Sequence, residues 1–524
     1  MKKNNFGVKS NRLIALILAL TVLKPSVQQK GGHPKYKTVF IAELFRHGAR
    51  TTTKVDKANF PFTSEIGFGN LTGNGQRMQF LLGQQIRKNY SELFNTGSGP
   101  SNFDYLLYSS PIPRCIVSAN SHMLGLYPPG PTAGDKVSTS QTGDGLKYMS
   151  PPGDEVPDVV FNNQTFPSAL PSGVRVFPIL NFQNIDYMFL HNGRETCPGM
   201  GSLKSQIDPK TASDTLDVTE TAKQMEAAGL KAEIIFGQST WTTDLLDKFF
   251  DQARAYLYYK GEQFPGMTED LYTQTRMIAS WHFSGEMSGG PKVAKFHTTT
   301  ISEQLLVNMN NKINGTNSKL KYLMFSGHDS TVYPFMHAHK IINGTCSKQM
   351  YETYMLNKTV IKDCQFLPEF SSSFLWELNK NSVDGEYYVR VLYNAQPIHF
   401  CQDNQDDYYC KFSDFEAEVQ SRLILPDFME ICKGSGGLWI EHKVYQSLTF
   451  IFMATTAFLA VMVVTLMAKL RKRAKGGGVS QAFETRLTEG QEGGKRYKLD
   501  QYKDAEEKVI HDRTKMDGNS EVVV

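Results

Sequence analysis

Three short runs of apolar residues stand out along residues 36–440. The first, residues 38–45, is β-branched, aromatic and almost continuously apolar, which is typical of a strand buried on both faces of a parallel sheet. Residues 104–108 and 320–325 are further runs of this kind, and residues 76–93 carry apolar side chains at helical spacing. The pattern predicts an α/β fold with a mixed, mostly parallel sheet flanked by helices.

The pattern changes in two other regions. Residues 130–275 begin with a stretch rich in Pro, Gly and Ser, and from about 212 to 259 they become helical. We interpret them as an insertion that forms a smaller helical cap over the sheet. Residues 370–400 alternate between apolar and polar side chains, which predicts an antiparallel hairpin at a sheet edge.

The N-terminus has the pattern of a targeting segment. Basic residues at positions 2, 3, 9 and 12 precede an apolar stretch over 13–23. This arrangement predicts a secretory signal peptide within residues 1–30. No clear pattern of small residues marks a cleavage site, so an uncleaved signal anchor is left open.

The C-terminal part predicts a membrane span. Residues 444–468 contain no charge and are numerous enough to cross a bilayer, and five of the next seven residues are basic. By the positive-inside rule these basic residues place the tail in the cytosol. We therefore expect a transmembrane helix over 444–470 and a disordered cytosolic tail over 471–524. The alternative is a buried core helix.

This topology makes the chain a single-pass type I membrane protein. Residues 36–440 would be lumenal or extracellular, at a lysosome, an endosome or the cell surface. Six Asn-x-Ser/Thr sequons precede the predicted span and are candidate glycosylation sites: Asn70, Asn89, Asn163, Asn314, Asn343 and Asn357. All seven cysteines precede it too, so disulfides are chemically allowed. Because seven is odd, at least one thiol stays reduced or pairs between chains.

The composition of the chain argues against some classes of binding partner. A formal net charge of +4 on 524 residues is too small to favour nucleic acid. No cysteine or histidine spacing is typical of a zinc site, and we predict neither a metal nor another cofactor. A homodimer is left open.

Polar and charged residues follow each of the three predicted strands. The segment Arg46-His47-Gly48-Ala49-Arg50 follows the first strand, Arg114 comes soon after the second, and His328 and Asp329 follow the third. In open α/β sheets, ligands bind beyond the carboxyl ends of the strands. We therefore expect these residues to converge on one pocket.

Their chemistry suits a phosphate dianion. The guanidinium groups of Arg46, Arg50 and Arg114 can hold phosphate oxygens through forked hydrogen bonds. Neighbouring cations help to keep the imidazole of His47 neutral, so it can attack phosphorus and form a phosphohistidine.

The remaining two residues complete the predicted reaction. His328 can donate a hydrogen bond to the developing charge. Asp329 can protonate the leaving oxygen as a general acid and then help to activate water. The reaction needs no metal because the arginines supply the positive charge.

These motifs closely resemble the histidine acid phosphatases, the acid branch of the histidine phosphatase superfamily. The resemblance covers most of 36–432 and is nearest to the membrane-anchored lysosomal and prostatic type. It implies an α/β domain with a smaller helical cap, phosphomonoester substrates and the same residue roles. Two positions depart from the family pattern: Thr52 replaces a usual proline, and Ser109-Ser110-Pro111 replaces a frequent Ser-Thr-Asp.

The resemblance also implies a disulfide pattern. Two pairs would be family pairings, Cys197–Cys432 and Cys401–Cys410. Cys346–Cys364 would then be local to this chain, and Cys115 would keep a buried thiol.

The leading hypothesis is thus an acid phosphatase that hydrolyses phosphate monoesters through a phosphohistidine with Asp329 as the general acid. A catalytically silent ectodomain that uses the fold for binding or adhesion is one alternative. A specialised phytase or lysophospholipid phosphatase is another, and a sugar-phosphate mutase is disfavoured by the secretory features.

Overall fold

The computed structural model describes the part of the chain that was expected to fold. The described residues are 35–53, 66–94, 100–130, 170–181, 188–190, 197–200, 216–288, 291–342, 346–361, 364–401 and 408–434. The predicted signal segment, the predicted span over 444–470, the tail, Asn163 and Asn343 lie outside them. Among the helices within the described ranges, none is both long enough and apolar enough to cross a membrane.

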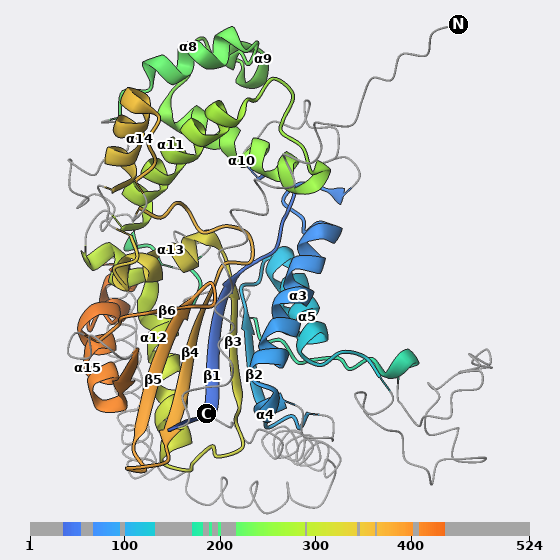
Figure 1. Ribbon diagram of the computed structural model, residues 1–524, viewed down its shortest axis with the longest axis vertical. Helices are drawn as coiled ribbons and strands as arrows, with labels where there is room; N and C mark the ends of the chain where they lie inside the picture. Colours follow the sequence, from blue (N-terminus) through green and yellow to red (C-terminus); the bar gives the residue numbers. More distant parts are fainter. Residues whose placement is uncertain are drawn as a thin grey trace, which may run out of the picture. The chain divides into compact units, whose positions relative to one another are not determined.

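One sheet forms the centre of the fold (Figure 1). Its strands are β1 (Tyr36–Arg46), β2 (Tyr105–Ser109), β3 (Tyr322–Gly327), β4 (Ser373–Asn381), β5 (Tyr387–Tyr393), β6 (Gln396–Ile398) and β7 (Tyr409–Lys411). Their order is β2-β3-β1-β4-β5-β6, with β7 also paired to β5. The first three strands correspond to the three apolar runs, and β4 and β5 form the predicted antiparallel hairpin.

The sheet is mixed, but the prediction that it is mostly parallel was wrong. Among the described strands, only the β2–β3 and β1–β3 pairs run parallel. The pairs β1–β4, β4–β5, β5–β6 and β5–β7 are antiparallel. Antiparallel strands can be joined by short turns, whereas parallel neighbours need a long crossover. The short connections that follow β4 and β5 therefore account for the antiparallel β4–β5 and β5–β6 pairs.

Helices cover both faces of the sheet because β1 alternates its side chains between them. Ile41 and Phe45 pack in the core beneath α3 (Gly73–Asn89), α4 (Ser91–Phe94) and α5 (Pro113–Leu126). Phe40, Ala42 and Leu44 pack in the larger core beneath α12 (Pro291–Ile313), α13 (Asp329–Ala338) and α15 (Phe412–Leu423). Burial on both faces explains the almost continuous apolar run of β1.

A second group of helices lies beyond the carboxyl ends of β1 and β3 (Figure 1). It consists of α8 (Thr219–Ala227), α9 (Ala232–Phe236), α10 (Thr243–Lys260), α11 (Glu269–Ser288) and α14 (Cys346–Asn357). The hydroxyl of Tyr354 on α14 donates to Asp270 on α11 at 2.7 Å. These cap helices therefore come from both sides of β3, and not from residues 130–275 alone. The 3-10 turn η2 (Pro171–Gly173) precedes them in sequence.

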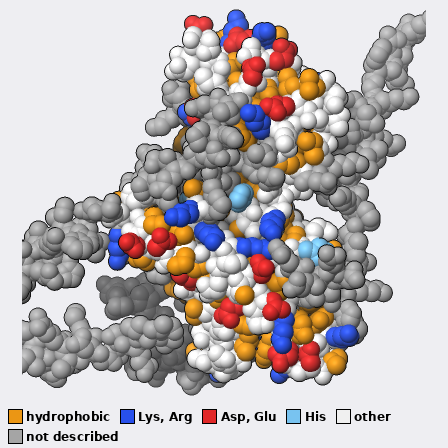
Figure 2. Space-filling model, turned by 90° about the vertical axis from the view of Figure 1, so that its left-hand side faces the viewer, with side chains coloured by type: hydrophobic (Ala, Val, Ile, Leu, Met, Phe, Trp, Pro, Cys, Tyr) orange, Lys and Arg blue, Asp and Glu red, His pale blue; other side chains and the backbone are white. Residues whose placement is uncertain are grey.

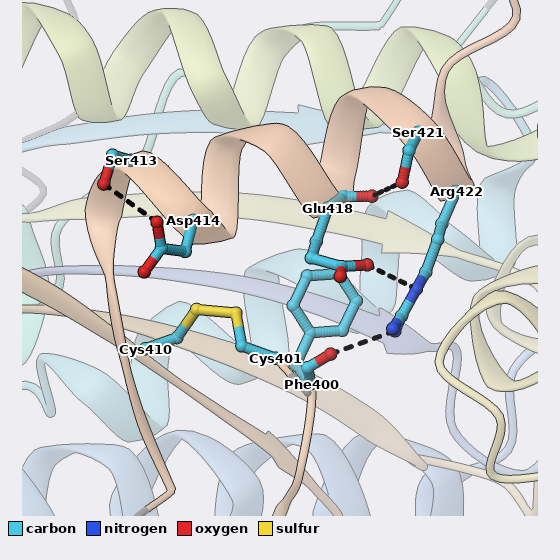
Figure 3. Close-up of a disulfide and its surroundings, with 8 residues drawn as sticks. All are labelled: Phe400, Cys401, Cys410, Ser413, Asp414, Glu418, Ser421 and Arg422. Carbon is cyan, nitrogen blue, oxygen red and sulfur yellow. Dashed lines mark hydrogen bonds and ion pairs between the residues drawn. A yellow bond between two sulfur atoms is a disulfide. The ribbon is translucent and has the colours of Figure 1, made fainter. Parts of the chain in front are cut away.

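Three disulfides link described residues, and they are the pairs that the resemblance implies: Cys197–Cys432, Cys346–Cys364 and Cys401–Cys410. The Cys401–Cys410 bond lies beside α15, where Arg422 donates to the carbonyl of Phe400 at 3.0 Å (Figure 3). Cys115 is buried and keeps its thiol.

Candidate active site

His47 lies directly after β1 and is buried. Its backbone N–H donates to the carbonyl of Gly327 at the end of β3, at 2.9 Å, which ties the two strand ends together. Its Nδ1 lies 2.8 Å from the carbonyl oxygen of Gly48. A carbonyl can only accept, so Nδ1 carries the hydrogen, and Nε2 of the neutral ring keeps its lone pair. This tautomer leaves Nε2 available as a nucleophile.

The loop after His47 packs tightly against the start of α3. A Cβ atom added to Gly48 would lie 2.2 Å from the carbonyl oxygen of Gly75, and one added to Gly75 would lie 2.1 Å from that of Ala49. Thr72, the N-cap of α3, donates its hydroxyl to Ala49 at 2.9 Å and accepts from Gly75 at 3.0 Å. The glycines of this loop and helix therefore permit a close backbone approach that fixes the position of His47.

Arg46 is buried at the end of β1, and protein groups surround its guanidinium. Nη1 donates to the carbonyl of Pro368 at 2.6 Å, and Nη2 lies 2.6 Å from Oδ2 of Asp329. The guanidinium carbon lies 4.3 Å from the ring centre of Phe370. Burial and the nearby charge of Arg254 lower the pKa of Arg46 to about 9, so it stays a cation at acid and neutral pH.

Arg50 forms a two-point contact with a carboxylate from the cap. Nη1 and Nη2 lie 3.1 and 2.9 Å from the two oxygens of Asp251 on α10. Nη1 also donates to the carbonyl of Thr51 at 3.0 Å. The fork that was predicted to hold phosphate is therefore occupied by Asp251.

Arg114 and His328 contact each other at the ends of β2 and β3. Nη2 of Arg114 lies 3.3 Å from Nδ1 of His328, and the Nε2 of His328 lies 2.8 Å from the hydroxyl of Ser110. Arginine only donates, so Nδ1 accepts and Nε2–H points to the hydroxyl. In this arrangement both nitrogens of His328 have contacts within the protein, and His328 orients Arg114.

Asp329 is the first residue of α13, and its Oδ2 is the atom that Arg46 contacts. Burial alone would raise the pKa of its carboxyl. Arg46, Arg50 and Arg254 outweigh that effect and hold the pKa of Asp329 well below its ordinary value. The carboxyl is therefore ionised while the arginines around it are not neutralised by an anion.

Neighbouring cations also lower the pKa of His47, where they disfavour the charged form of the ring. Burial, followed by the charges of Arg114, Arg46 and Arg50, holds the pKa of His47 well below its ordinary value. The rings of His47 and His328 lie with their centres 5.5 Å apart. The six residues predicted from sequence are therefore brought together, and the imidazole among them stays neutral in acid.

Sequence reasoning missed four further residues of this site. Asp251 and Arg254 come from α10, and Glu369 and Phe370 immediately precede the loop into β4. Phe370 lies under three guanidinium groups, at 4.3 Å from Arg46, 5.9 Å from Arg50 and 5.0 Å from Arg254. The only sign of Asp251 and Arg254 in the sequence is a pair of charged residues on the face of α10 that is buried. Nothing in the sequence indicates that this face lies next to the ends of β1 and β3.

Two observations bear on other ligands. Within the described ranges, no group of three His, Cys, Asp or Glu side chains is placed to hold a metal ion. On the face in Figure 2, Lys and Arg side chains are intermixed with Asp and Glu. Nucleic-acid sites present a clustered basic surface, and this face does not have one.

Comparison with known proteins agrees with this geometry. The sequence model described as "Histidine phosphatase superfamily (branch 2)" matches residues 39–394. The chain belongs to this superfamily. The match confirms the family that the motifs after β1 and β3 predicted.

Several curated relatives are similar over most of the chain. Lysosomal acid phosphatase of Xenopus laevis is 20% identical and covers 82% of this chain and 86% of its own length. Prostatic acid phosphatase of Homo sapiens is 23% identical over 69% of this chain and 78% of its own. Counting factor 60 of Dictyostelium discoideum is 22% identical over 71% and 74%. The family and the acid phosphatases support phosphatase activity in general.

Among solved structures, the apo form of Hafnia alvei phytase is similar. It has a TM-score of 0.49 and 14% identity, and the match covers 76% of this chain and 99% of the phytase.

Proposed function

We propose that this chain hydrolyses phosphate monoesters through a phosphohistidine on His47. The observation that carries the proposal is the tautomer of His47. Its Nδ1–H donates to Gly48, and Nε2 keeps a lone pair within a group of buried arginines. A neutral nucleophile among fixed cations suits attack on a phosphate dianion.

The first half of the reaction transfers the phosphoryl group to the protein. Nε2 of His47 forms a bond to phosphorus while the ester P–O bond breaks, and Asp329 gives its proton to the leaving oxygen. In the second half, water attacks phosphorus and the N–P bond breaks. The Asp329 carboxylate takes the proton from this water, and inorganic phosphate is released. Arg46, Arg50 and Arg114 stabilise the charge on the phosphoryl oxygens in both halves.

The charge balance explains how Asp329 obtains its proton. In the empty site the arginines keep its carboxyl ionised. A bound phosphate dianion offsets those positive charges, so the pKa of Asp329 rises when substrate binds. An acid medium supplies the proton. Burial is the largest cause of the lowered pKa of His47 and does not depend on the arginines, so it favours the neutral nucleophile when phosphate is bound as well. Both shifts favour activity at acid pH.

The setting that we propose is lumenal or extracellular. The relatives named lysosomal and prostatic acid phosphatase support such a location. The four sequons within the described residues, Asn70, Asn89, Asn314 and Asn357, are all exposed, which is compatible with glycosylation. The signal segment, the membrane span and the cytosolic tail belong to the same proposal, and a homodimer stays a prediction.

A catalytically silent binding protein is the competing function. The relative named Counting factor 60 does not bear the name of an enzyme. Against this alternative, this chain has all six residues that the reaction requires, and they are clustered around His47. Arg46, His47, Arg50 and His328 are buried, and Arg114 and Asp329 are half-buried.

The experiment is an assay of the full-length chain on an aryl phosphate across acid and neutral pH. We expect clear turnover, and a loss on the order of 10³-fold or more in His47→Ala. His337→Ala is the matched control, because His337 lies on α13 outside the site, and it should retain activity. Absence of turnover in the unmodified chain would favour the silent binding protein.

A further inference from the structure

Asp251 on α10 makes an unusual number of contacts with the loop after His47. Its two oxygens accept from Nη1 and Nη2 of Arg50 at 3.1 and 2.9 Å. Oδ2 also lies 3.2 Å from the hydroxyl of Thr52, 3.2 Å from the backbone N–H of Thr53 and 3.4 Å from the hydroxyl of Thr53. One buried carboxylate of the cap therefore contacts three residues of the catalytic loop, Arg50, Thr52 and Thr53.

Thr52 takes part in this contact through its side chain. The resemblance in sequence leads us to expect a proline at this position, and proline would stiffen the loop by fixing φ. Threonine does not fix φ, but its hydroxyl donates to Asp251. The loop is thus held by hydrogen bonds to the cap.

The contact also determines which donors Arg50 can offer. Nη1 and Nη2 are engaged with Asp251, whereas Nε is buried and makes no hydrogen bond to any described residue. A buried donor without an acceptor is costly, so the site favours an anion that accepts from Nε. Asp251 therefore fixes the guanidinium so that one edge is reserved for a ligand.

Arg254 extends this arrangement to the general acid. It lies three residues after Asp251, on the same face of α10, and it is also buried. Its Nη2 lies 3.6 Å from Oδ1 of Asp251 and 3.9 Å from Oδ2 of Asp329. One turn of a cap helix thus joins a phosphate-binding arginine to the acid that protonates the leaving group.

We propose that Asp251 and Arg254 are positioning residues for phosphoryl transfer. Asp251 aligns Arg50 in the phosphate site, and Arg254 holds the carboxyl of Asp329 in place. The inference rests on the proposed function and adds that the cap supplies part of the catalytic alignment.

The first test measures equilibrium binding of inorganic phosphate to the full-length chain by calorimetry, in a His47→Ala background that cannot turn over. Loss of a negative charge near the site would by itself tighten phosphate binding. We expect Asp251→Ala to weaken it instead, by roughly tenfold, as is typical when the partner that orients a ligating group is removed. Unchanged or tighter binding would overturn the proposal.

A matched control and a double-mutant cycle separate positioning from general support of the fold. Asp247 lies one turn earlier on α10, is equally buried and contacts His282 at 3.1 Å. Asp247→Ala can lower stability but should leave phosphate affinity unchanged. In an Arg50→Ala background, Asp251→Ala should no longer weaken phosphate binding and should leave only the tightening that follows from the lost negative charge. Additive losses of affinity would contradict an action through Arg50.

The second test uses the pH profile. Asp329 faces Arg46, Arg50, Arg254 and His47. In Arg254→Gln the loss of one cation raises the pKa of Asp329, so the acid stays protonated to higher pH. The alkaline limb of kcat/KM should therefore move to higher pH, and it should not move in Arg276→Gln, where the lost arginine contacts Glu369. An unmoved limb in Arg254→Gln would refute the role of Arg254.

If the His47→Ala chain binds phosphate but the unmodified chain shows no turnover, the proposed function fails while the positioning of Arg50 can still be measured. If turnover is normal and the Asp251 variant binds phosphate as its parent does, the further inference alone fails. The two results are therefore distinguishable.

Discussion

At the scale of single residues, the charges of four arginines and the groups that each of them contacts determine the properties of the site. Arg46, Arg50 and Arg254 are buried, and Arg114 is half-buried. Arg50 and Arg254 share Asp251, and Arg46 contacts Asp329. Arg114 contacts Nδ1 of His328. Among the charged groups acting on His47, Arg114 has the largest effect on the pKa. The nucleophile therefore stays neutral mainly through burial and Arg114.

Arg114→Gln tests this account. Removing the cation raises the pKa of His47, and activity requires the neutral ring. The acid limb of kcat/KM should therefore move to higher pH, while kcat/KM at its optimum falls because one phosphate donor is lost. Arg77→Gln, on the exposed surface of α3, should leave the profile unchanged. A limb that stays in place, or moves to lower pH, would contradict the electrostatic account.

At the scale of elements, the catalytic loop depends on how closely α3 approaches it. Gly75 lies against the carbonyl of Ala49, and Thr72 contacts both. Gly73 lies in the same first turn of α3, but a Cβ there would have no neighbour within 4 Å. The two glycines differ only in what surrounds them, which makes them a matched pair.

Gly75→Ala should lower the free energy of unfolding by about 1–3 kcal/mol, because the added methyl group overlaps backbone that cannot yield easily. Gly73→Ala should be neutral or stabilising by up to about 1 kcal/mol, since alanine favours a helix. Urea denaturation of both variants measures the difference. Equal free energies of unfolding for the two variants would show that α3 can move away from the catalytic loop at little cost.

At the scale of the whole molecule, disulfide bonds link segments of the chain that are distant in sequence. Cys197–Cys432 joins residues 235 positions apart, whereas Cys401–Cys410 joins residues 9 positions apart. In the chain-entropy account, a longer closed loop restricts the unfolded state more. The first disulfide should therefore contribute more to stability.

Replacing both cysteines of the Cys197–Cys432 pair with serine should destabilise the protein by about 3–5 kcal/mol. The same change at Cys401 and Cys410 should cost less. Thermal denaturation of the two double variants compares them directly. A larger effect from the short loop would indicate that local packing around α15 outweighs chain entropy.

The sequence predicted the parts of this molecule that leave a local pattern. Apolar runs located β1, β2 and β3, and residues at their ends gave Arg46, His47 and Asp329. It did not reveal Asp251 or Glu369, because a charged residue on a buried helix face resembles one on a solvent-exposed face until the partner is known. The mostly parallel sheet was wrong for a related reason. The direction of a strand depends on how it is connected to its neighbours. The sequence predicted the antiparallel β4–β5 hairpin, but it did not predict that this hairpin would make half of the sheet antiparallel.

The central claim, that His47 carries the phosphoryl group, is tested most directly by trapping the intermediate. Asp329→Asn should slow attack by water, and an aryl phosphate with a good leaving group does not need the general acid. Rapid alkaline quenching and peptide mass spectrometry should then find phosphate on His47, and none in the His47→Ala, Asp329→Asn double variant. Phosphate on another residue, or an equal signal without His47, would contradict the account.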